Sequence, residues 1–201
     1  MSLYAQLLEQ ARAYSLPEFV AVLAAIAYLL LAIRQNIWCW LFAGISTAIY
    51  IGVFIAAKLY MESLLNGFYF VMAIYGWYVW STGNSDGHRR PVVIWPLRVH
   101  AMAIAGIVFA SAISGFLLQT ETDAALPYID SLTTWFAVWA TFLVARKVLE
   151  NWWYWLVIDI ASVIIYWSRG LELTSMLFIV YVVLIPFGLL SWTKSMRAQS
   201  A

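Results

Sequence analysis

Charged residues are scarce in this chain, since they make up only 10% of its 201 residues. Hydrophobic residues make up 65%, and a soluble domain of this length has too little interior to hide so many apolar side chains. The surplus indicates an integral membrane protein. The few Lys and Arg residues nearly balance the Asp and Glu residues and form no basic stretch interleaved with aromatics. This pattern excludes a nucleic-acid partner.

Cysteine and histidine are almost absent as well. Cys39 is the only cysteine and lies inside an apolar run, so it can form no internal disulfide and no thiolate metal cluster. His88 and His100 lie in or beside a polar connector without a partner at metal-ligand spacing, and we expect them to be solvated. No metal and no cofactor is expected.

Long apolar runs dominate what is present. A helix needs about 17 to 25 residues to cross a hydrocarbon core. Seven runs of about this length occur, at Pro17–Ile33, Ile37–Ala57, Leu64–Trp80, Val99–Leu118, Ile129–Ala145, Trp152–Trp167 and Leu173–Trp192. The connectors are short except for Ser81–Arg98, whose Gly, Asn and Ser residues indicate a solvated loop. The sequence therefore predicts an all-α integral membrane protein of seven transmembrane helices, with residues 1–201 in one domain.

The segment before the first run has its own signals. Apolar residues recur at helical spacing over Leu3–Ala11, which predicts a short helix lying on the membrane surface. Ser15 and Glu18, with Pro17 between them, predict a capping box. Arg12 does not form the positive leader that a cleaved signal peptide needs, so the N-terminus is expected to be retained.

Lys and Arg residues fall unevenly on the two sides of the predicted membrane. The side that holds the C-terminus carries Arg34, Arg89, Arg90, Arg98, Arg146, Lys147, Lys194 and Arg197, whereas the other side carries Arg12, Lys58 and Arg169. Since Lys and Arg concentrate in cytoplasmic loops, the chain is predicted to sit N-out and C-in in a bacterial inner membrane.

An internal repeat is the next feature. The residues Asn36, Trp38, Trp40 and Leu41 match Asn151, Trp153, Trp155 and Leu156 at an offset of 115. Further on, Ser63, Tyr69, Gly76 and Trp80 match Ser175, Tyr181, Gly188 and Trp192 at an offset of 112. These matches predict two parallel three-helix repeats, 17–80 and 129–192, joined by a linker helix at 99–118. The alternative is that aromatic-rich spans resemble one another by chance.

Asp159 is the one acidic residue deep in a predicted span, where a charge costs roughly 2.5 to 3.5 kcal/mol on insertion scales. Helical spacing places it on one stripe with Trp152, Trp155, Ser162 and Tyr166. Indole faces and a carboxylate suit a flat solute that is cationic or bears an amine. Two alternatives remain: the tryptophans belong to the interfacial belt, and Asp159 is protonated and hydrogen-bonded to a neighbouring helix.

The third span contributes Asn66, Tyr69 and Trp77 to the predicted substrate-binding set, and the second contributes Trp40. The Asn66 amide can orient a polar ligand, or it can form an interhelical contact worth only about 0.6 kcal/mol. Other residues have structural explanations: a helix cap for Asp130, and helix packing for Gly44 and Gly76.

Two tracts resemble the Pnu-type vitamin transporters, the family of the PnuC nicotinamide riboside carriers and of thiamine-carrying relatives. The tracts are Leu59 and Tyr60 through Leu65 to Tyr75, Gly76 and Trp77, and Arg146, Lys147, Glu150, Asn151, Trp152 and Trp155. The resemblance extends from Trp38 to Trp192. It implies a SWEET-like arrangement of three, one and three helices, usually a homotrimer, and facilitated diffusion with cytoplasmic phosphorylation as the metabolic trap.

The same resemblance implies a binding site. The family's WxxW pair falls on Trp152 and Trp155, its polar partner, commonly an amide, is Asp159 here, and an amide position in the third span is Asn66. A carboxylate suits nicotinamide riboside and thiamine alike, because each carries a fixed positive charge on an aromatic ring. We expect nicotinamide riboside first and thiamine second, although thiamine's amine donors suit a carboxylate acceptor well.

Other classes of protein are less consistent with the sequence. An intramembrane aspartyl protease needs two facing aspartates, and neither Asp130 nor Asp159 lies in a GxGD segment. An enzyme is therefore not expected. A structural or signalling membrane protein is the remaining alternative, and it predicts no saturable ligand binding. A channel would need a continuous polar pore lining, which is hard to find in these spans.

Overall fold

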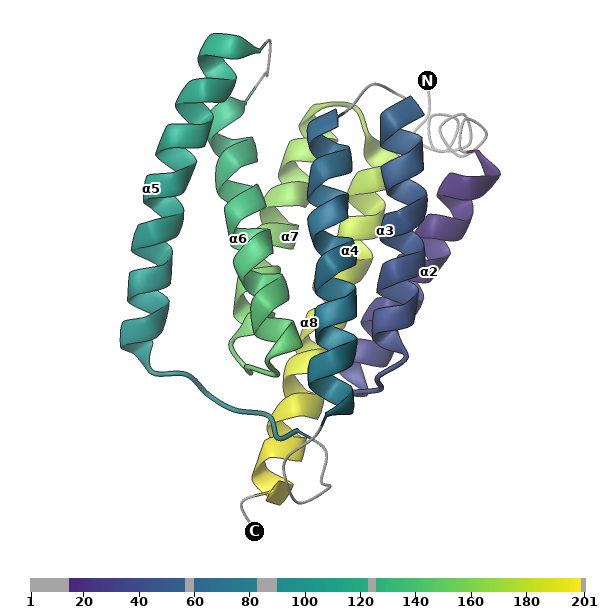
Figure 1. Ribbon diagram of the computed structural model, residues 1–201, viewed down its shortest axis with the longest axis vertical. Helices are drawn as coiled ribbons and strands as arrows, with labels where there is room; N and C mark the ends of the chain where they lie inside the picture. The colour runs from purple at the N-terminus through teal and green to yellow at the C-terminus, as the bar shows by residue number, and fades with distance from the viewer. Residues whose placement is uncertain (1–14, 57–59, 83–89, 123–125, 200–201) are drawn as a thin grey trace.

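The computed structural model describes residues 15–56, 60–82, 90–122 and 126–199. Within these ranges the chain forms seven α-helices (Figure 1). They are α2 (Leu16–Ile33), α3 (Cys39–Ala56), α4 (Tyr60–Ser81), α5 (Leu97–Glu121), α6 (Pro127–Ala145), α7 (Asn151–Ser168) and α8 (Glu172–Gln199). The surface helix predicted at the N-terminus and His88 both lie outside the described residues.

Each predicted span coincides with one of these helices. Five of them, α2, α3, α5, α6 and α8, are long and apolar enough to cross a membrane. The other two, α4 and α7, are rich in tryptophan and tyrosine and contain polar residues such as Asn66 and Asp159, which lowers their hydropathy. The predicted capping box is confirmed at the start of α2, where the backbone N–H of Ser15 donates to Glu18 Oε2 at 2.7 Å.

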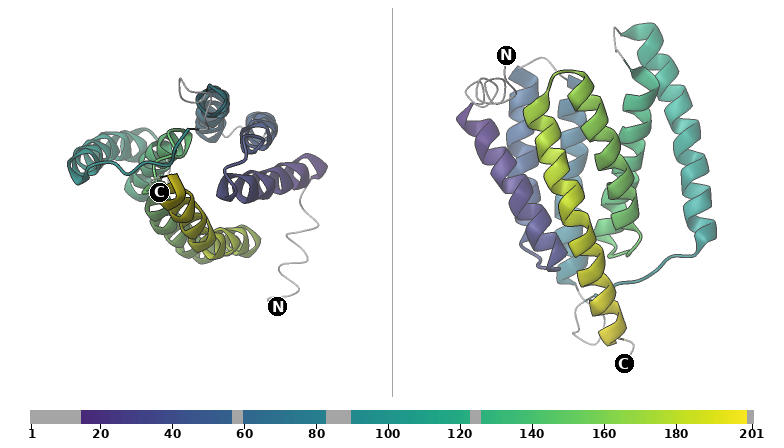
Figure 2. Two further views of the ribbon diagram at one scale, coloured as in Figure 1. Left: turned by 90° about the horizontal axis from the view of Figure 1, so that it is seen from below. Right: turned by 180° about the vertical axis from the view of Figure 1, so that it is seen from behind.

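The helices form two groups of three. Helices α2, α3 and α4 pack in sequence order, as do α6, α7 and α8, and the groups meet through α4 against α6 and α2 against α8. Helix α5 packs along α6 on the outside of the bundle (Figures 1 and 2). The two groups therefore meet along two seams, α4 with α6 and α2 with α8.

Hydrogen bonds join the two groups at the end of the bundle that carries the C-terminus. The indole N–H of Trp80 donates to the Ala145 carbonyl at 3.1 Å, and that of Trp192 donates to the Ala32 carbonyl at 2.9 Å. Further bonds at this end are Ser191 to Ile33, Arg146 to Tyr75 and Lys147 to Gln35. These hydrogen bonds hold the two groups together, so this end is closed.

Tryptophan rings packed on glycines occur in both groups. A Cβ on Gly76 would lie 2.3 Å from the Trp40 ring, which also meets Trp80 edge-on at 5.4 Å between centroids. The equivalent contacts 112 residues later join Trp152, Gly188 and Trp192. Gly76 is thus a helix-packing position, as predicted.

These contacts correct the register of the sequence matches. The offset of 115 pairs Trp40 with Trp155, but its structural counterpart is Trp152, three residues earlier. The turns before α3 and α7 have equal length, and each contains a left-handed residue, Gln35 at φ 52° and Lys147 at φ 55°. The offset of 112 therefore holds on both sides of these turns.

The connector after α4 differs in part from the predicted solvated loop. Val92 is buried, and Val93 forms a short parallel bridge to the turn between α6 and α7: its N–H donates to the Lys147 carbonyl and its carbonyl accepts from Leu149 N–H. The apolar valines following Pro91 explain this docking.

His100 was wrongly expected to be solvated. It is only 7% exposed, and its Nδ1 lies 3.0 Å from the Tyr154 hydroxyl of α7. An imidazole in an apolar helix is stabilised by such a partner, and α5, which packs along α6, reaches α7 through this side-chain contact.

Candidate functional site

The predicted stripe on α7 divides into two parts. Trp152 is 2% exposed and belongs to the aromatic cluster with Trp192 at the closed end. Further along the helix, Trp155 is partly buried and packs beside Tyr69 against Ala137, Ala140 and Ile158. Trp155 therefore packs both on the closed-end cluster and at the contact between α4, α6 and α7, whereas Trp152 is confined to the closed-end cluster.

Asp159 lies one turn beyond Trp155 and is 4% exposed. Among the described residues, none donates a hydrogen bond to its carboxylate. Its electrostatic neighbour is Tyr181 of α8, which also interacts with Tyr50 of α3. Ser162, the next residue of the stripe, is likewise buried. The bundle thus holds a carboxylate at mid-helix with no countercharge beside it.

Tyr181 connects Asp159 to a set of tyrosines from both groups. Tyr28 of α2 lies close enough to Tyr69 and Tyr181 to interact electrostatically, and Tyr69 interacts in the same way with Tyr166. These residues, together with Tyr50, come from α2, α3, α4, α7 and α8. We call Tyr28, Tyr50, Tyr69, Tyr166, Tyr181 and Asp159 the central cluster. Phenol rings and hydroxyls here can contact both the flat face and the polar groups of a solute.

Of the central cluster, Tyr181 was noted in the sequence only as a repeat match, and neither Tyr28 nor Tyr50 was assigned to the site. Tyr181 lies 112 residues after Tyr69, which was predicted, so extending the repeat to site residues would have identified it. The position 112 residues before Asp159 is Thr47, whose hydroxyl donates to the Ala43 carbonyl at 2.8 Å. The two groups therefore contribute different side chains at equivalent positions.

The remaining predicted residues lie elsewhere. The Asn66 amide donates to the Glu62 carbonyl of its own helix at 2.9 Å. Trp40 packs on Gly76 at the closed end, and Trp77 meets Trp38 edge-on at 5.4 Å. Asp130 is not the predicted helix cap, because its carboxylate pairs with Arg169 at 3.4 Å. Trp40 also packs against Tyr28 of the central cluster, with 6.0 Å between ring centroids, whereas Trp77 packs on Trp38 at the groove between α3 and α4.

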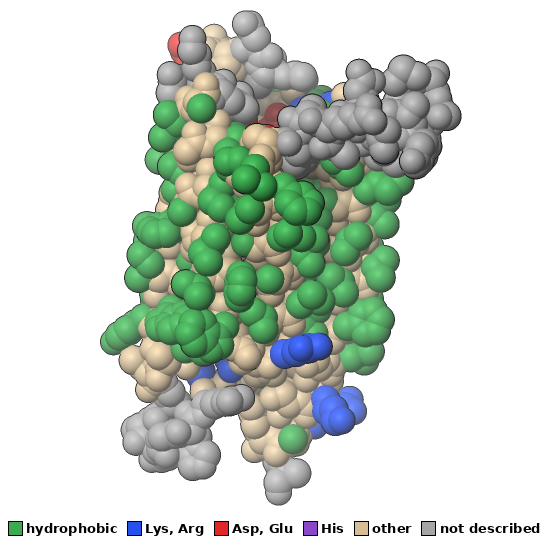
Figure 3. All heavy atoms as spheres, turned by 90° about the vertical axis from the view of Figure 1, so that its right-hand side faces the viewer, with side chains coloured by type: hydrophobic (Ala, Val, Ile, Leu, Met, Phe, Trp, Pro, Cys, Tyr) green, Lys and Arg blue, Asp and Glu red, His purple; other side chains and the backbone are tan. Residues whose placement is uncertain are grey.

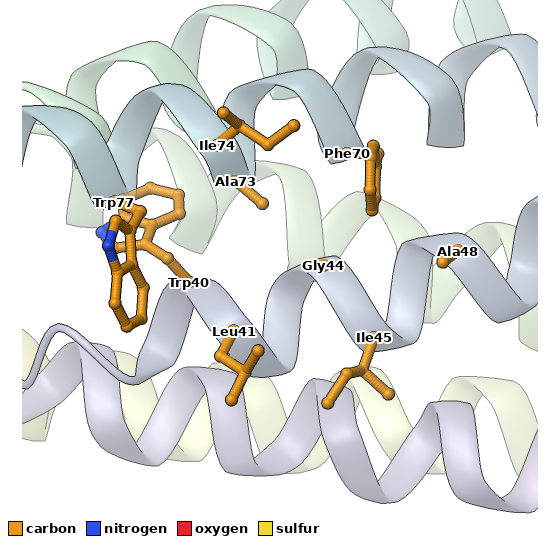
Figure 4. A pocket seen from close by; sticks show the side chains of 9 residues that line it. All are labelled: Trp40, Leu41, Gly44, Ile45, Ala48, Phe70, Ala73, Ile74 and Trp77. Atoms are coloured by element: carbon orange, nitrogen blue, oxygen red, sulfur yellow. The ribbon is translucent and has the colours of Figure 1, made fainter.

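Two cavities occur outside the central cluster. The first is an apolar groove of about 450 Å³ between α3 and α4 (Figure 4), lined by Trp40, Leu41, Gly44, Ile45, Ala48, Phe70, Ala73, Ile74 and Trp77. The second is a pocket of about 330 Å³ at the closed end, lined by Arg34, Gln35, Asn36, Ile37, Trp38, Trp80 and Lys147. We call the second the basic pocket, because the charged residues that line it are Arg34 and Lys147.

Basic residues gather toward the C-terminal end of the bundle, as the face drawn in Figure 3 shows in part, although Glu150 also lies at this end, beside His100 and Trp95. Of the described basic residues, the C-terminal end holds Arg34, Arg90, Arg98, Arg146, Lys147, Lys194 and Arg197. The opposite end holds the acidic residues Glu18, Glu62, Glu121, Asp130 and Glu172, together with Arg169. In the described part of the chain, no three His, Cys, Asp or Glu side chains are grouped as metal ligands. The acidic end favours the approach of a cation.

Comparison with known proteins gives consistent relatives. The family model described as nicotinamide mononucleotide transporter matches residues 15–194. The nicotinamide riboside transporter PnuC of Escherichia coli is 25% identical over 92% of this chain and 87% of its own length. The riboflavin/roseoflavin transporter RibM of Streptomyces davaonensis is 23% identical over 91% of this chain and 87% of its own length.

A solved structure resembles the fold. The crystal structure of the vitamin B3 transporter PnuC matches with a TM-score of 0.72 and 22% sequence identity, covering 98% of this chain and 90% of the other. The arrangement of the seven helices described above is thus similar to an experimentally determined membrane-protein fold.

Proposed function

Because the chain belongs to the nicotinamide mononucleotide transporter family, we propose that it is a membrane transporter whose cargo is nicotinamide riboside. The observation that carries this proposal is Asp159, which is 4% exposed, lies in the middle of α7 and receives no hydrogen bond from the described residues. Nicotinamide riboside supplies the missing positive charge on its pyridinium ring.

The energetics favour a ligand at this position. A carboxylate in a membrane-spanning helix is costly unless it is paired or neutralised. A cationic ring beside Asp159 provides the pair, and phenol faces attract the same charge. The hydroxyls of Tyr69 and Tyr181 can donate to or accept from ribose hydroxyls. The central cluster therefore suits both halves of the solute.

Transport follows from the arrangement of the two groups. We propose that α2–α4 and α6–α8 are two parallel copies of one three-helix unit with α5 as the linker, as in the SWEET-like arrangement. The contacts repeated at an offset of 112 support this proposal. Rocking of one unit against the other would open the closed end and release the cargo, with Asp159 near the axis of the motion.

The orientation and the energetics of uptake are parts of the same proposal. Seven described basic residues at the C-terminal end favour a cytoplasmic location for that end, hence N-out and C-in in a bacterial inner membrane. Facilitated diffusion, with cytoplasmic phosphorylation as the trap, and a homotrimer are implied by the family resemblance and stay predictions.

Binding of candidate vitamins to the purified protein tests the cargo. Isothermal titration with nicotinamide riboside, thiamine and riboflavin should give saturable binding of nicotinamide riboside. Asp159→Asn should weaken it by about 10- to 100-fold, because an interaction with a charged partner is lost. The matched control is Asp130→Asn, which removes a carboxylate that pairs with Arg169 outside the central cluster.

The outcomes are distinct. If only thiamine binds, thiamine replaces nicotinamide riboside as the proposed cargo. The proposed site at Asp159 would stand, since thiamine is also cationic. Saturable binding that Asp159→Asn leaves unchanged would refute the site. Absence of binding for all three vitamins would favour the structural or signalling alternative.

A further inference from the structure

The basic pocket is a second candidate ligand site that the cargo pathway does not use. It lies at the closed end, between the turn that follows α2, the end of α4 and the turn that follows α6. Its volume of about 330 Å³ falls within the range of small-molecule sites. None of the seven described residues that line it is acidic, so it repels a cation such as nicotinamide riboside and attracts an anion.

The two basic residues of the pocket differ in their surroundings. Lys147 is 3% exposed, its Nζ lies 4.6 Å from the centroid of the Trp80 ring, and it donates to Gln35 Oε1 at 3.2 Å. Arg34 is exposed at the end of α2. A buried ammonium beside an exposed guanidinium suits a phosphate group, which Arg binds through two parallel hydrogen bonds and Lys as a point charge.

The walls of the pocket also suit an aromatic ring. Trp38 and Trp80 line it, and Trp38 is held by its edge-on contact with Trp77. The amides of Gln35 and Asn36 lie in the same wall and can form hydrogen bonds with hydroxyls. A ligand that combines a phosphate, hydroxyls and a flat heterocycle matches this lining.

We propose that the basic pocket binds the phosphate monoester of a small heterocyclic nucleoside, the chemical class of the phosphorylated cargo, and that its occupancy slows uptake. The identity of the ligand depends on the function and orientation proposed above. Arg34 belongs to the first group of helices and Lys147 to the second, so a phosphate that contacts both links the groups at the end that must open. A ligand that binds the closed state better shifts the equilibrium toward it.

Phosphate binding is tested first, on the purified full-length protein. Inorganic phosphate and nicotinamide mononucleotide should both bind in isothermal titrations, and Arg34→Gln should weaken both by about tenfold or more. Lys147 is buried in a left-handed turn, so its substitution risks misfolding and Arg34 carries the test. The control is Lys194→Gln, which removes a positive charge at the same end outside the pocket and should leave binding unchanged.

Uptake is tested second. Vesicles of phosphatidylcholine that hold the protein should take up labelled nicotinamide riboside more slowly when loaded with nicotinamide mononucleotide than with sodium chloride of equal ionic strength. Arg34→Gln should abolish this difference in uptake rate. If the difference persists in the variant, nicotinamide mononucleotide competes at the central cluster instead, and the proposal is refuted.

Two further results would overturn the inference. A third result would separate the inference from the proposed function. Absence of binding for both probes at millimolar concentration would refute the site. Displacement of inorganic phosphate by phosphatidylglycerol, without binding of the mononucleotide, would assign the pocket to a lipid headgroup and refute the soluble ligand. Arg34-dependent binding of phosphate in a protein that carries no nicotinamide riboside would refute the proposed function and retain the anion site.

Discussion

The Nζ of Lys147 donates a hydrogen bond of 3.2 Å to Oε1 of Gln35, and the two residues occupy equivalent positions 112 residues apart. Both have left-handed backbone conformations, which non-glycine residues seldom adopt. The turns that end α2 and α6 therefore meet each other directly. This contact adds to the indole hydrogen bonds of Trp80 and Trp192 that close the C-terminal end.

Loss of the Lys147 contact should loosen this end. Gln35→Ala removes a hydrogen bond to a charged group, worth about 1.5 to 3 kcal/mol, and should raise the ratio of open to closed molecules by about 10- to 100-fold. Cys39 is buried at the start of α3 and is the only cysteine, so its rate of maleimide labelling reports the opening. Thr193→Ala is the control, because Thr193 bonds within α8 and its loss should not change the rate.

The packing of tryptophan on glycine should be intolerant of a methyl group. Gly188→Ala places a Cβ where the Trp152 ring lies, and Gly76→Ala does the same against Trp40. Overpacking of this kind lowers the free energy of unfolding by about 1 to 3 kcal/mol. Thermal unfolding in detergent measures it. Gly106→Ala, with no atom within 4 Å of the added Cβ, should be neutral, and equal stability of all three variants would contradict the packing.

The hydroxyl of Tyr181 should contribute to cargo binding. Tyr181→Phe keeps the aromatic ring and removes a hydroxyl that interacts electrostatically with Asp159, so the affinity for nicotinamide riboside should fall by about three- to tenfold. Titration of the purified variant gives the value. Tyr78→Phe alters an exposed tyrosine and should bind as the unsubstituted protein does. A loss shared by both variants would point to a general effect on folding.

The bond between His100 and Tyr154 should hold α5 against the rest of the bundle. Tyr154→Phe removes the hydroxyl that lies 3.0 Å from Nδ1 and should lower the free energy of unfolding by about 1 kcal/mol. Transport should persist, because Tyr154 lies outside the central cluster. Thr120→Val alters a hydroxyl bonded within α5 and serves as the control in the same unfolding assay.

The sequence was sufficient to predict the helices, because apolar runs and polar connectors are local signals. The capping box of Ser15 and Glu18 was predicted correctly, and α2 begins at Leu16, one residue before the predicted span. The surroundings of His100 could not be predicted in this way, since they depend on how α5 packs along α6 and so reaches Tyr154 of α7. The offset of 115 between the sequence matches was assigned for a related reason. Tryptophans alternate before α3 and α7, so the two segments can be aligned at more than one offset, and only the contacts of Trp40 and Trp152 distinguish these alignments.

The central cluster shows the same limit. Asp159 was predicted because a carboxylate within a transmembrane span is unusual, and this can be recognised from the sequence of one helix. Tyr28 and Tyr50 are ordinary residues of apolar helices, and their approach to Tyr181 is a property of the assembled bundle. Trp77 was assigned to the site from its helical face, yet it lines the groove between α3 and α4. Helical spacing places a residue on a face without telling which neighbour that face meets.

The difference between Thr47 and Asp159 has a consequence for stoichiometry. The two positions are equivalent in the chain, but only the second bears a carboxylate, while the Thr47 hydroxyl is bonded to its own helix. A single negative group neutralises a single monovalent cation, and a second such solute in the same space would be repelled by the first. Under the proposed function, passage through the bundle is then limited to one molecule in each cycle, and a binding isotherm should saturate at one solute for each polypeptide.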